Sequence, residues 1–265
     1  MIHFHSSNRY SCTMESRLIY GLGNSKSLFR SGDSIIDNVL RQGISHFDVA
    51  PLYGGGYAES LIGKFSKRND ITVTTKMGLN NWRTSSATSR YKPLSNKVIG
   101  KLLKKSVVPN YKIDFLKESM KASMERLGDS NTKGITFLLH EYLPVDDQNF
   151  TQLSAFLSEE KKAGSIMDYG VATSRMVTLT FLPKSLPILQ SDFDSAFALS
   201  RKTEYQDNEF RAFGLFRGFN DLSLDERDKR IESGREFLQR NVRNRIVIST
   251  LSMKHLEFAL RELNV

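Results

Sequence analysis

The stretch Gly43–Lys64 reads GISHFDVAPLYGGGYAESLIGK and joins a short apolar strand pattern to a helical one. We expect a strand over Ile44–Val49 and a helix of small and apolar residues over Tyr57–Phe65. The glycines Gly54–Gly56 between them indicate a sharp turn of the backbone. A strand followed at once by a helix is the unit from which parallel sheets are built, so this stretch favours an α/β fold.

The same rhythm continues on both sides of this unit. Before it, Arg17–Leu22 is typical of a buried strand and Ser31–Gln42 has apolar residues at helical spacing. After it, Ile71–Thr75 is a β-branched strand and Asp114–Leu127 an amphipathic helix that Gly128 ends. The polar residues from about 79 to 111 are too many for an ordinary connection, so we expect an insertion there.

The second half of the chain completes the pattern. Eight strands interleaved with helices predict a closed (β/α)8 TIM barrel as a single domain over residues 1–265. A doubly wound sheet is the alternative, but the G-x-G-x-x-G fingerprint after its first strand is absent. The remaining strands are expected at Gly134–Leu139, Ile166–Val171, Ile188–Gln190, within Glu209–Gly218 and at Arg245–Thr250, and the remaining helices at Asn149–Ala163, Asp225–Arg240 and Lys254–Leu263.

Composition narrows the class of partner. The chain has 265 residues, a net charge of +9 and a single cysteine, Cys12, so no intrachain disulfide is expected. No apolar run reaches membrane-spanning length and the N-terminus lacks a secretory pattern, so we expect a cytoplasmic protein without a membrane contact. The basic residues are spread along the chain, which favours an anionic small ligand over nucleic acid. We expect a monomer or small homo-oligomer.

Four ionisable residues lie at or just beyond the ends of expected strands: Asp48, Tyr53, Lys76 and His140. The carboxyl ends of the strands share one rim of a barrel, so these side chains should meet there. A carbonyl that receives hydride needs a proton donor, and a phenol with a pKa near 10 is a weak one. The Lys76 ammonium should lower the pKa of Tyr53, Asp48 should pair with Lys76, and His140 should orient the carbonyl oxygen.

These motifs resemble the aldo-keto reductase family. Gly43–Lys64 is similar to the family signature F-D-T-A-x-x-Y-G followed by E-x-x-L-G, Ile71–Gly78 to its T-K-x-G strand, and Phe137–Tyr142 to its strand ending L-L-H. The resemblance implies a (β/α)8 barrel, an NADP(H)- or NAD(H)-dependent oxidoreductase, and a carbonyl or alcohol substrate. Asp48, Tyr53, Lys76 and His140 match the family's catalytic tetrad in order and approximate spacing.

The resemblance also implies residues around the nicotinamide. Gln190 matches the glutamine that binds the carboxamide, and Gly23, beyond the first strand, is placed among the cofactor contacts. The family's G-V-S-N strand ending appears here as Gly170–Thr173, with Ala172 for the serine and Thr173 for the asparagine. Thr173 keeps a hydroxyl that can bond the amide, whereas Ala172 does not.

Further along, Phe210–Phe219 resembles the pyrophosphate-binding segment, which offers Arg211 and Arg217 as cations. Ile248–Leu260 resembles the adenine-side segment, in which NADPH-preferring members hold the 2′-phosphate with a lysine, a serine and an arginine. Ser249 and Thr250 replace the lysine and the serine here, and His255, with Lys254 beside it, stands at the arginine position. The resemblance therefore implies NADP(H) without excluding NAD(H).

Many family members continue past the last helix to cover the substrate pocket, so we expect a more open pocket here. Trp82 and Arg83, within the insertion, are the expected substrate contacts, and a sugar-like or other polar carbonyl is the expected substrate. No metal site is expected, since His3 and His5 lack a third ligand. Two alternatives stay open: a cofactor-binding barrel that regulates a partner without catalysis, and an anion- or nucleic-acid-binding barrel.

Overall fold

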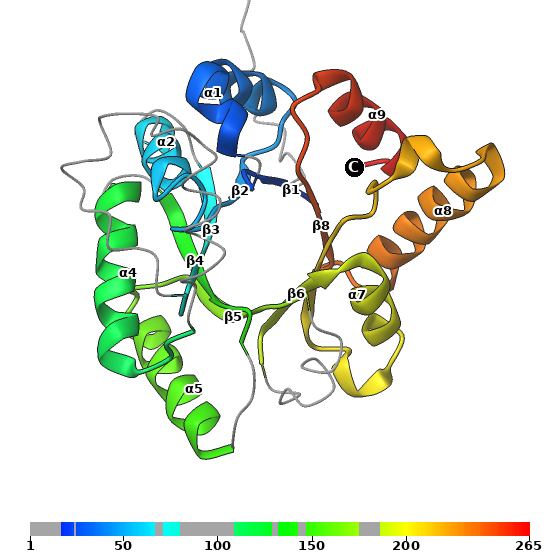
Figure 1. The fold of residues 1–265 in the computed structure, drawn as a ribbon. Helices are drawn as coiled ribbons and strands as arrows, with labels where there is room; N and C mark the ends of the chain where they lie inside the picture. The colour runs from blue at the N-terminus through cyan, green and yellow to red at the C-terminus, as the bar shows by residue number, and fades with distance from the viewer. Residues whose placement is uncertain are drawn as a thin grey trace, which may run out of the picture.

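In a computed structural model, eight parallel strands close into a barrel in their order along the chain (Figure 1). The structure describes residues 17–23, 25–66, 71–79, 109–128, 132–142, 147–174 and 186–265. The expected barrel is therefore confirmed and the doubly wound alternative is wrong. The strands are β1 Leu18–Gly21, β2 His46–Asp48, β3 Ile71–Met77, β4 Thr132–His140, β5 Asp168–Ala172, β6 Ile188–Asp192, β7 Glu209–Phe213 and β8 Arg245–Ile248.

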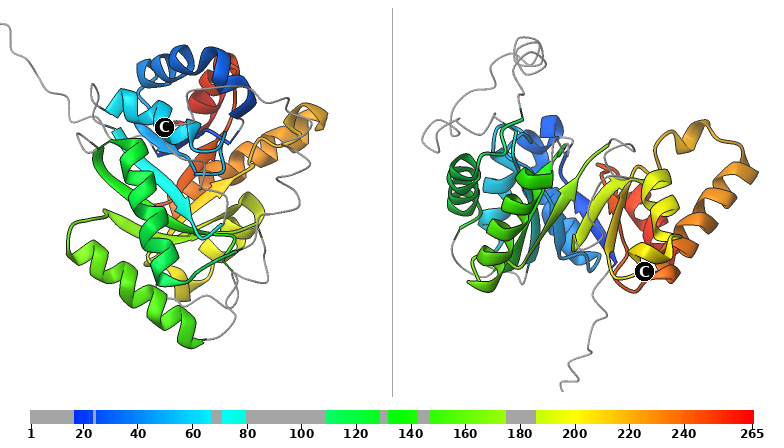
Figure 2. Two further views of the ribbon diagram at one scale, coloured as in Figure 1. Left: turned by 60° about the vertical axis from the view of Figure 1, so that its left-hand side comes forward. Right: turned by 90° about the horizontal axis from the view of Figure 1, so that it is seen from below.

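Helices surround this ring of strands, and Figure 2 shows the same arrangement in two further views, with α8 (orange) at the periphery. None of the helices within the described ranges is both long and apolar enough to span a membrane. The helices are α1 Ser25–Arg41, α2 Tyr57–Ser66, α4 Ile113–Leu127, α5 Asp147–Lys162, α7 Phe193–Ser200, α8 Leu224–Arg240 and α9 Met253–Leu263, with single 3₁₀ turns at Thr203–Tyr205 and Phe219–Asp221.

Two helices differ from expectation. α1 starts at Ser25 rather than Ser31, because the chain is already helical before a kink at Ser31, where φ is −137° and ψ is 18°. α7 was not expected, since FDSAFALS is too short and too uniformly apolar to show helical periodicity. Its start is fixed by the Asp192 side chain, which accepts a hydrogen bond of 3.1 Å from the Ser195 backbone N–H.

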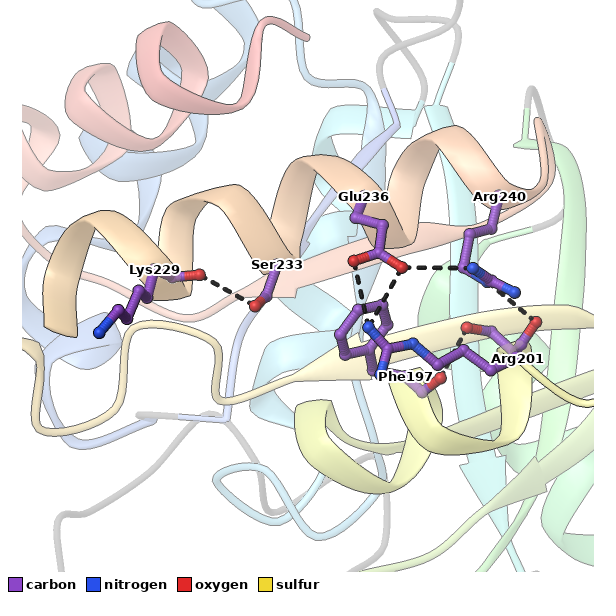
Figure 3. A network of polar contacts seen from close by, with 7 residues as sticks. Phe197, Arg201, Lys229, Ser233, Glu236 and Arg240 are labelled. Carbon is purple, nitrogen blue, oxygen red and sulfur yellow. Dashed lines mark hydrogen bonds and ion pairs between the residues drawn. The ribbon is translucent and has the colours of Figure 1, made fainter.

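A polar network joins α7 to α8 (Figure 3). The Arg201 guanidinium lies 4.0 Å from the centroid of the Phe197 ring and donates two hydrogen bonds to Glu236. Arg240 donates to the same carboxylate and to the backbone carbonyl of Ser200. One acidic side chain of α8 thus ties together two arginines at the end of α7 and the end of α8.

Apolar residues fill the layer between strands and helices, whereas the inside of the barrel is largely polar. Phe47, Val73, Phe137 and Phe210 belong to the large outer core. Inside the ring, Leu138, Ala172 and Ile188 form a separate small cluster. The outer layer supplies most of the apolar burial that stabilises the fold, which leaves the barrel interior free to hold charged and hydroxyl side chains.

The expected insertion at 79–111 leaves and re-enters the barrel at one point. Leu79 and Pro109 form an isolated antiparallel bridge, and the Asn110 N–H donates 2.7 Å to the Gly78 carbonyl. Gly78 has a φ of 99°, and a β-carbon there would lie 2.4 Å from the Tyr111 ring. Residues 80–108, which include Trp82 and Arg83, lie outside the described residues.

Helix α2 packs directly on the end of α4 through a glycine. A β-carbon on Gly63 would lie 2.4 Å from the Arg126 carbonyl oxygen. Gly63→Ala is therefore expected to lower the free energy of unfolding by about 1–3 kcal/mol through overpacking, measured by urea denaturation. The matched control is Lys64→Ala, because the Lys64 side chain is 63% exposed. Equal stability of the two variants would contradict this close contact.

Candidate active site

A buried ion pair occupies the carboxyl ends of β2 and β3. Lys76 Nζ lies 2.5 Å from Asp48 Oδ1, and the two side chains are 3% and 4% exposed. Lys76 also donates 3.1 Å to the Val49 carbonyl oxygen. Because both charges are buried, each depends on the other for compensation. The structure therefore contains the ion pair expected from the sequence.

Tyr53 lies against this pair. The Lys76 ammonium is 5.0 Å from the centroid of the Tyr53 ring. On its other side, a β-carbon on Gly23 would lie 3.7 Å from the same ring, so the glycine lets the backbone after β1 approach the phenol. The turn that carries Tyr53 is closed by its own N–H, which donates 2.9 Å to the Ala50 carbonyl. Gly23, Tyr53 and Lys76 thus meet at one point.

The protonation of Tyr53 differs from the expectation. Burial raises the pKa of the phenol, and the Asp48 and Glu141 carboxylates raise it further, while the charge and hydrogen bond of Lys76 act in the opposite direction. Burial outweighs the ammonium, so the expected lowering of the Tyr53 pKa is wrong in its net direction. Burial alone lowers the pKa of Lys76, but Asp48 and Tyr53 reverse this and raise it. At neutral pH the phenol and the ammonium both carry their protons.

His140 ends β4 at the same rim. Burial, with a smaller effect from the Lys76 charge, lowers the pKa of His140 to about 3. The imidazole is therefore neutral at physiological pH and can donate one ring N–H to an oxygen without carrying a charge. The strand end is fixed by Tyr111, whose hydroxyl donates 2.8 Å to the His140 backbone carbonyl.

Gln190 reaches the tetrad from the opposite side of the barrel. Its Nε2 donates 3.0 Å to Asp48 Oδ2, although β6 and β2 are not neighbours, so both side chains lie inside the ring. Within the described residues, Gln190 Oε1 is buried and has no hydrogen-bond partner. A buried amide oxygen without a donor is costly, so Oε1 is open to a hydrogen bond from a water or a ligand.

A cleft of about 800 Å³ extends from the ends of β7 and β8. Four of the expected cofactor residues, Arg217, Thr250, Lys254 and His255, line it. Arg227 also lines this cleft, and sequence reasoning missed it because it is one of many charged residues on α8.

Aromatic side chains line the same cleft. The ring centroids of Phe216, Phe219 and Phe258 lie 5.3–6.2 Å apart. Arginine and lysine side chains together with aromatic rings suit an anion that carries an aromatic base.

Comparison with known proteins agrees with this geometry. The profile described as the Aldo/keto reductase family matches residues 19–182. The chain belongs to the aldo/keto reductase family. This is a family of oxidoreductases that interconvert carbonyl and alcohol groups with a nicotinamide cofactor. No curated protein matches the sequence.

Solved aldo-keto reductases share the fold of this family member at low identity. An aldo-keto reductase from Bacillus halodurans, in its holo form, is 19% identical with a TM-score of 0.67, over 94% of this chain and 87% of that one. An NADPH complex from Klebsiella pneumoniae is 13% identical with a TM-score of 0.61, over 94% and 86%. A glycerol dehydrogenase from Gluconobacter oxydans is 17% identical with a TM-score of 0.60, over 94% and 91%.

The structure corrects the placement of Arg211 in this aldo/keto reductase. Arg211 is 2% exposed and lies inside the barrel, not in the cleft. Its Nε donates 2.6 Å to Glu209 and its Nη1 donates 2.5 Å to Thr74 Oγ1. The expectation failed because Arg211 lies in the middle of β7 and faces inward, whereas the cleft begins only at Phe213, where this strand ends.

The same inner layer contains His46. Its Nε2 lies 2.7 Å from Thr74 Oγ1, so Thr74 links His46 to Arg211. Burial, followed by the charges of Arg211 and Arg245, lowers the pKa of His46 well below its usual value. A neutral imidazole fits beside a buried guanidinium, so His46 has a structural role in the barrel interior.

Thr173 and its neighbours form the last part of the site. The Thr173 backbone N–H donates 2.9 Å to the main-chain carbonyl of Gln190, so the end of β5 lies beside β6 at this residue. Its hydroxyl lies 3.4 Å from Glu141 Oε2. Glu141 was not among the expected residues, although it follows His140 directly, because nothing in its spacing distinguishes it from a solvated surface carboxylate.

Proposed function

We propose that this aldo/keto reductase reduces an aldehyde or ketone with NADPH and that Tyr53 donates the proton to the carbonyl oxygen. The observation that carries the proposal is the protonated phenol of Tyr53 beside the buried Lys76–Asp48 pair. His140, neutral at the same rim, would orient the carbonyl oxygen. As negative charge develops on that oxygen, the Lys76 ammonium stabilises the phenolate that Tyr53 becomes.

The residues present fit a nicotinamide nucleotide. Gln190 Oε1 offers an acceptor for the carboxamide N–H, and Thr173 is joined to the main chain of the same residue. The Arg217 guanidinium, the Lys254 ammonium and the His255 imidazole line the cleft that would hold the phosphates. When bound, the nicotinamide supplies the hydride. The protein groups orient the carbonyl, exclude water and hold the proton at the Tyr53 oxygen.

Lys254 and His255 in this cleft support a preference for NADPH over NADH, because the two nucleotides differ only in the 2′-phosphate. Lys254→Ala is expected to weaken NADPH binding about tenfold, since one charge-assisted hydrogen bond is lost, and to leave NADH binding almost unchanged. Fluorescence titration of the purified protein with each nucleotide measures this. Lys229→Ala is the control, because Lys229 is 72% exposed and pairs with Asp225 on α8. Equal weakening of both nucleotides would remove Lys254 from the 2′-phosphate site.

We also propose that the substrate is a small polar carbonyl and that Trp82 and Arg83, within the insertion, contact it. The polar rim of Tyr53, His140 and Glu141 supports hydroxyl-rich substrates over apolar ones. Initial rates with short sugars and hydroxyaldehydes, compared with unsubstituted aldehydes of equal length, test the substrate class. A preference for the unsubstituted aldehydes would contradict it.

A second candidate is a barrel that binds the cofactor but regulates a partner rather than turning over substrate. Ala172 at the family's serine position favours it, because one hydroxyl is missing beside the carboxamide. Sustained consumption of NADPH with a broad carbonyl panel separates the two functions. Tight NADPH binding without turnover on any carbonyl would support the regulatory candidate.

A further inference from the structure

Glu141, directly after His140, has an unusual backbone. Its φ is 51°, in the left-handed region, and within the described ranges only Asn264 shares a positive φ among residues other than glycine. Asn264 caps the end of α9, where this conformation is common. A glutamate seldom adopts it, so the surrounding contacts must hold it there.

The contacts of the Glu141 side chain show what holds it. Its carboxylate accepts hydrogen bonds from the Ser174 hydroxyl at 3.1 Å, from the Ser174 backbone N–H at 3.3 Å and from the Thr173 hydroxyl at 3.4 Å. Its backbone N–H donates 2.6 Å to the Ala172 carbonyl. The turn after β4 is thus bent so that one carboxylate lies over the end of β5.

Thr173 links Glu141 to the other residues of the site. Thr173 adjoins Gln190, whose buried Oε1 is open for a carboxamide. The Glu141 charge also acts on the phenol, since it is one of the causes that raise the pKa of Tyr53. Glu141 therefore lies directly after His140, binds Thr173 and Ser174, and carries a charge that acts on Tyr53.

We propose that the Glu141 carboxylate binds at the carboxamide end of the nicotinamide pocket and makes the protein favour the oxidised cofactor over the reduced one. The inference rests on the proposed function. The nicotinamide ring is positively charged when oxidised and neutral when reduced, while the rest of the nucleotide is the same in both. A fixed negative charge beside the ring therefore stabilises NADP⁺ selectively. Where Ala172 lacks a hydroxyl, a Glu141 oxygen supplies the acceptor for the carboxamide N–H.

The test compares the dissociation constants of NADP⁺ and NADPH by calorimetric titration, without substrate. Glu141→Gln keeps the shape but removes the charge, so the ratio Kd(NADP⁺)/Kd(NADPH) is expected to rise about tenfold. Glu141→Asn gives the same direction and protects folding, because asparagine tolerates a positive φ. The control is Glu159→Gln, an exposed carboxylate of α5, which should leave the ratio unchanged.

The outcomes separate this inference from the proposed function. If the unmodified protein binds neither nucleotide, the proposed function fails and the inference with it. If it binds both, and both Glu141 variants keep the original ratio, the proposed function stands and the inference is overturned. A ratio that rises in both variants, with NADPH affinity changed less than about twofold, supports it.

Discussion

Replacing Tyr53 with phenylalanine is expected to lower kcat for carbonyl reduction by about three orders of magnitude, the typical contribution of a positioned general acid. Phenylalanine keeps the aromatic ring beside Gly23 and Lys76, so the shape of the pocket is kept and only the proton donor is lost. The Kd for NADPH should stay within about twofold, because no cofactor contact is assigned to the phenol. Initial rates and fluorescence titration on the same preparation measure both quantities.

Tyr57→Phe is the matched control, because it removes a phenolic hydroxyl from the first turn of α2, where the Tyr57 ring stacks on Phe29 at 4.3 Å. It should keep most of the activity. If Tyr53→Phe lost cofactor affinity and turnover equally, the phenol would be a structural or cofactor contact rather than the acid.

The pH dependence of the unmodified protein provides a further check on Tyr53. Its pKa is raised above the ordinary phenol value, so the acid stays protonated throughout the neutral range. The rate of carbonyl reduction should be constant there and fall only as pH rises through this raised pKa, whereas alcohol oxidation, which needs the phenolate, should rise. A reduction rate that already falls between pH 6 and 8 would show that another group limits the reaction.

Lys76→Met is expected to lower the free energy of unfolding by about 3–5 kcal/mol, because it leaves the Asp48 carboxylate buried without its counter-ion. It should also abolish measurable turnover, since the ammonium no longer stabilises the phenolate. Urea denaturation monitored by circular dichroism measures the first effect and initial rates the second. Both effects come from one ion pair that is almost completely buried.

The double variant Asp48→Asn with Lys76→Met separates stability from catalysis. Without either charge, the interior no longer contains an unpaired carboxylate, and the amide oxygen introduced at position 48 can still accept the hydrogen bond from Gln190. Most of the lost stability should return while turnover stays absent. A double variant as unstable as Lys76→Met alone would show that the packing of the lysine chain, rather than its charge, stabilises the barrel.

The barrel and its tetrad were predictable because both depend on short-range patterns. The spacing of apolar residues in the sequence predicts the order of strands and helices. The strand ends share one rim of a barrel, which predicts that Asp48, Lys76 and His140 meet there. Arg211 was misplaced because the sequence pattern does not mark where β7 ends, and Arg211 lies within that strand rather than beyond it. Glu141 was missed because its orientation depends on a left-handed backbone and on Ser174, which follows the end of β5.

The pKa of Tyr53 was also beyond sequence reasoning, for a different reason. The sequence places a lysine near the phenol, but the pKa depends on how far burial opposes that charge. Burial is a property of the whole assembled rim, including the approach of Gly23 that the structure shows.

The bridge between Leu79 and Pro109 brings the two ends of the segment 80–108 together. Because the chain leaves and returns at a single point, a change in its length alters the entropy of closing that loop only slowly and does not change the register of β3 with β4. Exchanging residues 80–108 for another sequence is therefore expected to leave the barrel intact, including β3 and β4, which carry Lys76 and His140.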